Sequence, residues 1–394
     1  MWARSLVVLH GLVLLWAACL GLPNAMAQTA RFQIDFAYAQ ASPAASNPAD
    51  LARASFIPYQ DELILAFPES ATWIRLTIHT REGSPGTTGR PANDDLYTLK
   101  IGPNILERVD LFEPTAAGWI QRTDHGFQSK RPYRCLDERH CFRLDRIDAP
   151  VTTVYLRIES ASVLRVHADI LGSQELMGTT VDRIRNVSTL LAIGVCLLGI
   201  SLYLLALDRS VLMLCFVLFQ GSNILGVASL NGLLGQWFTA APVDLAAAAH
   251  ASIIARTLTI LVLCLAFMLQ HKASRSYKVM SSSLIAASVA DLALVAAGQR
   301  QLALQINLAV WTALPLVQIV GALSAQDIKP TIRWTFVLFN LMVAILTAIV
   351  LKGLFFPTEV DAYFPVMKTF SDLRFNGLWV SLALFALVFM ERRH

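Results

Sequence analysis

The side chains best suited to acid–base chemistry gather between residues 119 and 140. The adjacent Asp124 and His125 could activate a water or a hydroxyl group, but the stretch contains no nucleophile elbow and no H-E-x-x-H metal motif. Two interpretations stay open, a solvated loop and a binding face built from aromatic and charged groups. We expect binding rather than catalysis, and no cofactor. The predicted ligand-binding residues are Trp73, Arg75, Trp119, Asp124, His125, Arg131 and Tyr133.

Cysteine chemistry is expected in the same part of the chain. Of the six cysteines, Cys135 and Cys141 lie close together in the segment that is predicted to be exported and soluble. Export to an oxidising compartment favours a disulfide between them. Two reduced thiols, or a metal site that includes His140, are the alternatives; we predict the disulfide and no metal site.

Two ionisable residues interrupt long apolar runs later in the chain. Arg256 lies seven residues from the outer end of one predicted span, and Asp291 lies six residues from the outer end of the next. At ~1.5 Å of helical rise per residue, both lie roughly 10 Å deep. Ionisable groups within a membrane usually face the bundle interior. We predict that the two side chains form an ion pair; the alternative is that one or both extend to water.

Short alternating segments position the first group of residues. Apolar and polar residues alternate in Val154–Glu159 and in Trp73–Ile78, which is typical of strands with one buried and one solvated face. Segments of this kind, without a convincing helix, predict an antiparallel β-sandwich of the jelly-roll type. The predicted strands are 31–38, 72–80, 95–101, 106–112, 118–122, 140–145, 152–159 and 163–171.

Apolar runs of nearly membrane-spanning length follow. A bilayer core ~30 Å thick needs about 20 apolar residues in a helix. Hydrophobic residues make up 55% of the 394-residue chain and charged residues 15%, against ~25% charged in soluble domains. The predicted fold is therefore a two-domain one, with the β-sandwich followed by an α-helical seven-transmembrane bundle. The predicted spans are 187–207, 211–230, 249–270, 279–297, 302–323, 335–352 and 373–390.

The first 27 residues have the features of a signal peptide. Arg4 precedes an apolar run, and Ala25–Ala27 offers a small-residue cleavage site; an uncleaved eighth helix is the alternative. We divide the rest into a periplasmic sandwich domain, 28–175, and a membrane domain, 176–394, with a short cytoplasmic tail.

The distribution of Lys and Arg predicts the orientation of the bundle. With the sandwich outside, the loops that would lie inside carry eight Lys and Arg residues and the outer loops carry two. Arg183 and Arg185, just before the first span, run against this bias. Because much of the basic excess marks orientation, the formal net charge of +4 gives no indication of a nucleic-acid partner.

Several stretches together carry a family resemblance. In the predicted sandwich they are 71–78, 105–114, 131–132 and 155–160, and in the membrane part 199–209 and 230–238. With the order of the parts, they resemble the bacterial seven-transmembrane receptors with diverse intracellular signalling modules, and the sandwich resembles the second type of extracellular sensor domain in that family. The resemblance implies a multi-pass protein of the bacterial inner membrane, with its N-terminal domain periplasmic and its C-terminus cytoplasmic.

The resemblance also implies a function. Members usually continue into a histidine kinase, a diguanylate cyclase or a phosphatase, whereas this sequence stops four residues after the seventh predicted span. We expect a non-enzymatic receptor for a small, carbohydrate-like ligand. Its output would come from a cytoplasmic signalling protein or from a C-terminal module absent from this sequence; a homodimer stays open. The alternatives are a transporter or accessory subunit of an envelope export system with a periplasmic partner-binding domain, and an exported enzyme with a membrane anchor.

Overall fold

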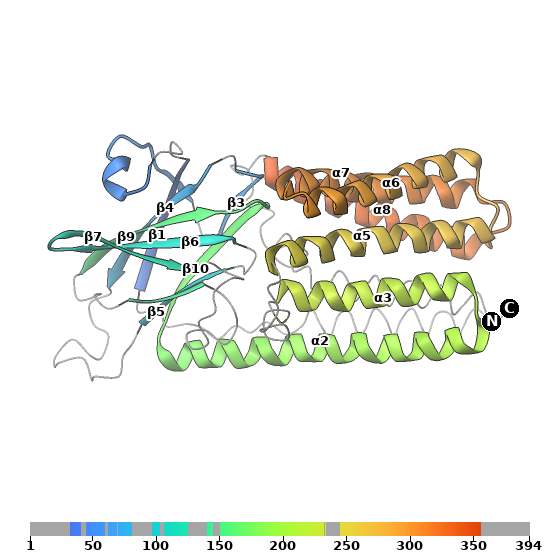
Figure 1. The fold of residues 1–394 in the computed structure, drawn as a ribbon, viewed down its shortest axis with the longest axis horizontal. Coiled ribbons are helices and arrows are strands. Elements are labelled where there is room, and N and C mark those ends of the chain that lie inside the picture. The colour runs from blue at the N-terminus through green and yellow to red at the C-terminus, as the bar shows by residue number, and fades with distance from the viewer. Residues whose placement is uncertain are drawn as a thin grey trace.

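A computed structural model shows a β-domain at one end of a set of long helices (Figure 1). Helix α2 runs along one edge of the helical part, and α6, α7 and α8 lie along the opposite edge. The structure describes residues 32–40, 45–59, 62–68, 70–80, 97–102, 106–124, 140–144, 150–231, 233 and 245–355.

The described part of the N-terminal domain contains two antiparallel sheets, which confirms the predicted β-sandwich. One sheet has the strand order β2-β1-β4-β9-β6-β7 and the other β3-β10-β5-β8. The strands are β1 Phe32–Gln40, β2 Ile57–Tyr59, β3 Glu62–Leu65, β4 Thr72–Thr80, β5 Tyr97–Gly102, β6 Arg108–Thr115, β7 Gly118–Asp124, β8 His140–Leu144, β9 Val151–Glu159 and β10 Leu164–Leu171. Each predicted strand matches one of these within a few residues; β2 and β3 were not predicted, because both are too short to show alternation.

The connectivity of the sheets follows the expected type. From β3 onward the chain passes between the two sheets, so that β4-β9-β6-β7 packs on β3-β10-β5-β8. This order fits a jelly roll of eight strands. Strands β1 and β2 extend the first sheet to six, with β1 pairing β4 along its whole length.

The alternation seen in the sequence determines which side chains enter the sandwich core. On β4, Ile74, Leu76 and Ile78 have no exposed surface and pack between the sheets with residues of β5, β6, β9 and β10. The intervening residues of the same strand, Trp73 and Arg75, therefore point to the opposite face of the six-stranded sheet. One strand thus supplies both the core and the outer face.

Six described helices are long and apolar enough to cross a membrane, judged by length and composition. Helix α3 has the predicted bounds, whereas α2 starts 14 residues before the predicted first span and forms one continuous helix of 36 residues. The seventh predicted span, 373–390, lies outside the described residues. The helices are α2 Ser173–Asp208, α3 Val211–Leu230, α5 Leu245–Gln270, α6 Arg275–Ala296, α7 Arg300–Ser324 and α8 Pro330–Phe355.

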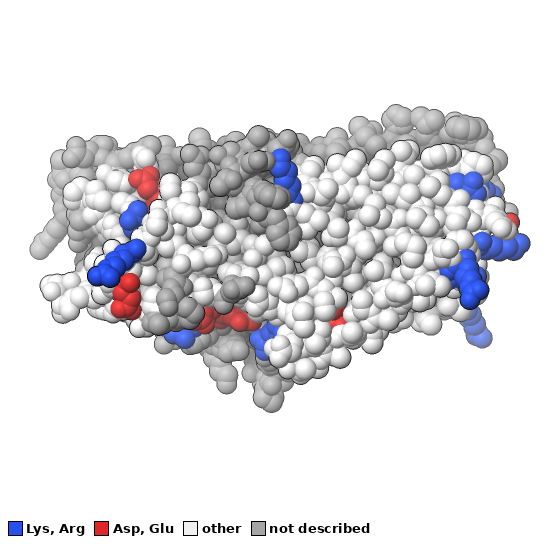
Figure 2. All heavy atoms as spheres, turned by 90° about the horizontal axis from the view of Figure 1, so that it is seen from above, with Lys and Arg blue, Asp and Glu red and all other residues white. Residues whose placement is uncertain are grey.

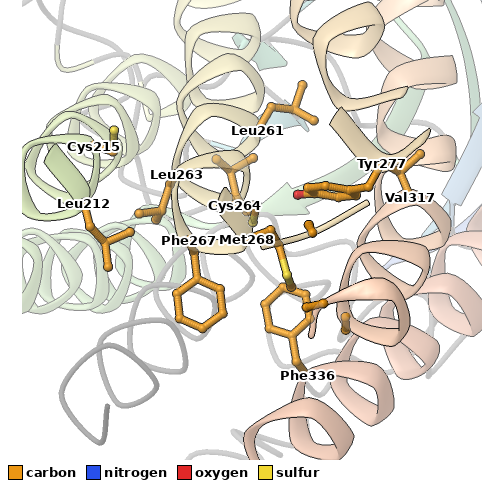
Figure 3. Packing of buried hydrophobic residues seen from close by; sticks show 14 of the residues in the cluster. Leu212, Cys215, Leu261, Leu263, Cys264, Phe267, Met268, Tyr277, Val317 and Phe336 are labelled. Carbon is orange, nitrogen blue, oxygen red and sulfur yellow. The ribbon is translucent and has the colours of Figure 1, made fainter. Parts of the chain in front are cut away.

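The helices pack around one large apolar cluster contributed by α3, α5, α6, α7 and α8. Figure 3 shows Leu212 and Cys215 on one side of this cluster and Tyr277 and Val317 on the other. Close helix approach depends on Gly321, because a Cβ atom there would lie 2.5 Å from Cε2 of Tyr277. The Tyr277 hydroxyl donates to Oε1 of Gln318 at 3.1 Å, which joins α6 to α7.

The β-domain contacts the helices at two separated places. Only Gly172 stands between β10 and α2, and Nζ of the buried Lys100 on β5 donates to Oγ1 of Thr179 on α2 at 3.3 Å. On the other edge, Arg300 at the start of α7 lies 3.4 Å from Oε1 of Glu107, which precedes β6. The sandwich is therefore joined both to the first helix and to the α7 end of the bundle.

Candidate functional site

The outer face of the six-stranded sheet carries two cross-strand rows of large or charged side chains. In the first row Trp73 of β4 is opposite Arg157 of β9, which is opposite Asp110 of β6. In the second row Arg75 is opposite Tyr155, and Tyr155 is opposite Phe112. Side chains opposite one another on antiparallel strands are neighbours. The register alone thus gathers aromatic and charged groups at the centre of this face.

A short segment covers one part of the face. The 3-10 helix η1, Pro48–Leu51, is capped by Asn47, whose Oδ1 accepts from the Ala49 amide at 3.1 Å. Leu51 packs with Trp73 and Phe112, whose ring centroids are 5.2 Å apart. Trp73 has no exposed surface. Its predicted role as a ligand contact is therefore corrected to packing under this segment.

The rest of the aromatic group reaches solvent. Trp119, on the edge strand β7, meets Tyr155 edge-to-face with centroids 5.2 Å apart. The guanidinium carbon of Arg75 lies 4.9 Å from the centroid of Phe56. All four side chains are partly exposed. Of the predicted ligand-binding residues, Arg75 and Trp119 are therefore brought to the same face, on either side of Tyr155.

A network of charged side chains beside the aromatic residues joins strands β6, β7 and β9 on the outer face of the sheet. Asp110 is fully buried and accepts hydrogen bonds from Oγ1 of Thr123 at 2.6 Å, Nε of Arg108 at 3.1 Å and a terminal nitrogen of Arg157 at 3.2 Å. Burial by itself would raise the pKa of this carboxyl, but the hydrogen bonds from Thr123 and Arg108 and the charge of Arg108 hold the pKa below its ordinary value. Arg157 also bonds Glu159 at 2.6 Å.

This arrangement suits binding better than catalysis. The Asp110 carboxylate is ionised and fully engaged, so it is not poised to move a proton. Partly exposed aromatic rings beside a guanidinium offer apolar faces and hydrogen-bond donors to one ligand. Within the described residues no group of His, Cys, Asp and Glu could hold a metal ion.

Several predicted site residues cannot be compared with the structure. Asp124 is the last residue of β7, and its side chain is not described. His125, Arg131, Tyr133 and Cys135 lie outside the described residues. Cys141 lies on β8, opposite Lys100 of β5; its disulfide with Cys135 stays a prediction.

The predicted ion pair in the membrane part does not form. Both carboxylate oxygens of Asp291 lack a hydrogen-bond partner, and the Arg256 guanidinium instead lies 5.6 Å from the ring centroid of Trp311 on α7. The reason is the direction of the Arg256 side chain. Ile254 of α5 packs in one cluster with Val295 of α6. Arg256 is two residues further along α5, which turns its side chain about 200° away from the side of α5 that Ile254 occupies.

The sequence also left out residues that the face contains. Tyr155 and Arg157 belong to the segment with the clearest strand pattern, and their alternation with buried residues shows that they point outward. What the pattern could not supply is the register that places Tyr155 against Arg75 and Trp119. Phe56 carries no signal, because it lies in an irregular segment before β2.

The fold defines the class of protein: an antiparallel β-sandwich followed by helices that are long and apolar enough to cross a membrane. Residues 28–171 match the 7TMR-DISM extracellular 2 family. The predicted sensor domain is confirmed by this match, which covers the N-terminal domain. The six described helices that follow are consistent with a seven-transmembrane receptor that carries this sensor. A comparison with curated proteins finds no match.

Proposed function

We propose that the chain is an inner-membrane receptor whose sandwich binds a small carbohydrate-like ligand in the periplasm. The observation that carries this proposal is the partly exposed group of Arg75, Trp119 and Tyr155 on a domain of a receptor sensor family. Sugar rings have apolar faces that pack on aromatic side chains, and hydroxyl groups that accept from a guanidinium.

The junction supports transmission of the bound state. Because one residue separates β10 from α2, a rotation of the sandwich acts directly on a helix of 36 residues. The contact between Glu107 and Arg300 gives the sandwich a second connection, to α7. A ligand shifts the bundle only by its difference in affinity between two states, and these contacts are where two arrangements of the sandwich on the helices would differ.

We infer that the output lies at the end of the bundle away from the sandwich. Figure 2 shows Lys and Arg gathered at that end of the face in view. The described basic residues there are Arg209, Lys272, Arg275, Lys278, Lys329 and Arg333. A cytoplasmic end with this charge fits the positive-inside rule. We propose seven passes and a cytoplasmic C-terminus. The output partner would be a module of the histidine kinase or diguanylate cyclase class.

The proposal is tested by thermal shift of the full chain in lipid nanodiscs against mono- and disaccharides. A ligand that binds only the folded form raises the melting temperature. We expect Trp119→Ala and Arg75→Ala to abolish a shift seen in the wild type. His79→Ala is the matched control: His79 lies on the same face of β4, roughly 13 Å from Arg75 at ~3.3 Å per residue, and bonds Asp35 instead.

Two results would contradict the receptor. One is a saccharide shift that both face variants retain, because the ligand would then bind elsewhere. The other is accumulation of a solute in vesicles that contain only this chain, which would indicate a transporter.

A further inference from the structure

Buried side chains on the facing sides of α6 and α7 carry oxygen atoms that have no partner among the described residues. Asp291 has no exposed surface and both its carboxylate oxygens lack a hydrogen bond. Asn307 is 5% exposed and its Oδ1 lacks a donor; Ser288 is fully buried and its hydroxyl lacks a partner. Because a buried polar atom without a partner costs free energy, these groups call for a ligand.

The register of the α6–α7 hairpin brings the carboxylate and the amide together. At the outer end, Val295 of α6 and Ala303 of α7 belong to one buried cluster. At the inner end, Tyr277 of α6 packs against Gly321 of α7. Tyr277 is eighteen residues before Val295 on α6, and Gly321 is eighteen residues after Ala303 on α7. Eighteen residues make five helical turns, so the same face of each helix is turned towards the other at both ends. Asp291 is four residues before Val295, and Asn307 is four residues after Ala303.

One turn inward from the Val295–Ala303 contact, Asp291 therefore faces Asn307. Ser288 lies three residues from Asp291, on the same face of α6. The three side chains present four oxygen atoms without partners within about one helical turn of each other.

The charge of this group identifies what it would bind. A lone carboxylate in a membrane interior is costly unless a positive charge neutralises it. The basic side chains of α5 are Arg256 and His250, and neither donates to Asp291, since both carboxylate oxygens lack a partner. On α7 the basic side chain is Arg300, which contacts Glu107 at the sandwich. One carboxylate neutralises one charge, so the fitting ligand is a single monovalent cation.

We propose that Asp291, Asn307 and Ser288 form an intramembrane site for a monovalent cation, either a proton held on Asp291 and donated to Asn307 or a sodium ion among their oxygens. Both fill the same acceptor group with one positive charge. The site is separate from the ligand-binding face of the sandwich, so the two proposals stand or fail independently.

Infrared difference spectra of the full chain in nanodiscs distinguish the two cations. The spectrum of Asp291→Asn is subtracted from the spectrum of the wild type, both recorded in choline chloride at neutral pH. If a proton is bound to Asp291, the difference spectrum contains a carboxylic-acid C=O band that comes from the wild type alone. With sodium as the ligand that band is absent; sodium chloride then raises the melting temperature above choline chloride at equal ionic strength, and Asp291→Asn abolishes the rise.

A second variant tests the partner and does not depend on Asp291→Asn folding. In Asn307→Leu, the proton arm predicts that the acid C=O band moves to higher frequency, because the acid loses its acceptor. If the ligand is sodium, the concentration of sodium that gives half of the rise in melting temperature should increase about tenfold, because one interaction with a charge is lost. Asn340→Leu is the matched control, because Asn340 is an equally buried amide on α8 that donates to the Phe336 carbonyl.

The proposal is overturned if the wild type shows neither the acid band nor a sodium-dependent rise in melting temperature. It is also overturned if the band or the rise is the same in Asn307→Leu as in the wild type. If Asn340→Leu also lost the signal that the wild type gives, that signal would report general packing of the bundle and the site would be rejected.

Discussion

Two fully buried aspartates, Asp110 in the sandwich and Asp291 in the bundle, have opposite surroundings. Neither side chain has exposed surface. Asp110 accepts from Arg108, Thr123 and Arg157, whereas the Asp291 carboxylate has no hydrogen-bond partner among the described residues. A buried carboxylate can therefore be either paired with hydrogen-bond donors or left without a partner, and its neighbours decide which of the two occurs.

The difference follows from the elements that carry each residue. Asp110 points to a sheet face whose other strands are half solvated, so long polar side chains such as Arg157 can lie across it with one end in water. Asp291 is one helical turn from the apolar contact of Val295 and Ala303, and the polar side chains that we place beside it, Asn307 and Ser288, are short and uncharged. A satisfied carboxylate of the first kind holds structure together, while an unsatisfied one marks a place for a ligand.

The largest effect is expected from Asp110→Ala. The substitution removes the buried carboxylate that Arg108 and Arg157 share, and Arg157, which is 18% exposed, keeps Glu159. Removing one partner of a buried ion pair costs about 3 kcal/mol or more. We expect that loss in the free energy of unfolding of the sandwich, measured by chemical denaturation of the full chain with tryptophan fluorescence. Asp35→Ala is the control: Asp35 is 61% exposed and bonds His79 on the same face, so roughly 0–1 kcal/mol is expected. If Asp110→Ala and Asp35→Ala lost equal amounts of unfolding free energy, the buried ion pair would contribute no more to stability than the exposed one.

Acid pH tests the same carboxylate without leaving a cavity. Because the folded pKa of Asp110 lies below its ordinary value, the folded form binds fewer protons than the unfolded form as the pH falls. Its contribution to stability is therefore complete above the unfolded pKa of about 3.9 and is lost as the pH falls further. We expect the melting temperature of wild type to fall more steeply than that of Asp110→Asn below about pH 4. Parallel curves would contradict the assigned pKa.

The sequence predicted the elements better than the contacts between them. Alternation in Trp73–Ile78 and Val154–Glu159 located β4 and β9, and hydropathy located α3 to the residue, because both signals are local. The outward direction of Tyr155 was readable from the same alternation. Its proximity to Trp119 was not, since that depends on how strands far apart in sequence pair.

The wrong predictions were those that inferred a contact or an exposed position in the fold from a sequence pattern alone. Trp73 fits an exposed strand position, but a segment some 20 residues earlier covers it. Arg256 and Asp291 were paired by depth counted from hydropathy, but the Arg256 guanidinium lies against Trp311 of α7. An apolar run does not show in which direction a side chain leaves its helix.

A smaller effect is expected where the bundle relies on close packing. A methyl group in Gly321→Ala would meet Tyr277 Cε2 at 2.5 Å, and overpacking of this kind costs about 1–3 kcal/mol. We expect a lower melting temperature in detergent, and a longer distance between α6 and α7 in spin-label measurements. The matched control is Gly199→Ala on α2, where nothing lies within 4 Å of the added Cβ; it should be neutral or slightly stabilising. Similar losses in both variants would show that helix glycines act here through flexibility and not through contact.

The smallest effect is expected at an acid that has a partner but is exposed. Asp327, in the turn between α7 and α8, lies 2.7 Å from Nζ of Lys272 and is 51% exposed. Its hydrogen bond and charge raise the pKa of Lys272 above the ordinary value. Asp327→Asn should leave the melting temperature unchanged. It should increase the rate at which Lys272 reacts with an amine acylating reagent, because more of the amine is then unprotonated at a given alkaline pH. Peptide mass spectrometry measures that rate, with Lys278 as the internal reference. If Lys272 reacts no faster in the variant, the ion pair has no effect in solution. A fall in melting temperature as large as that of Asp110→Ala would mean that solvent exposure does not separate strong from weak carboxylate partners in this chain.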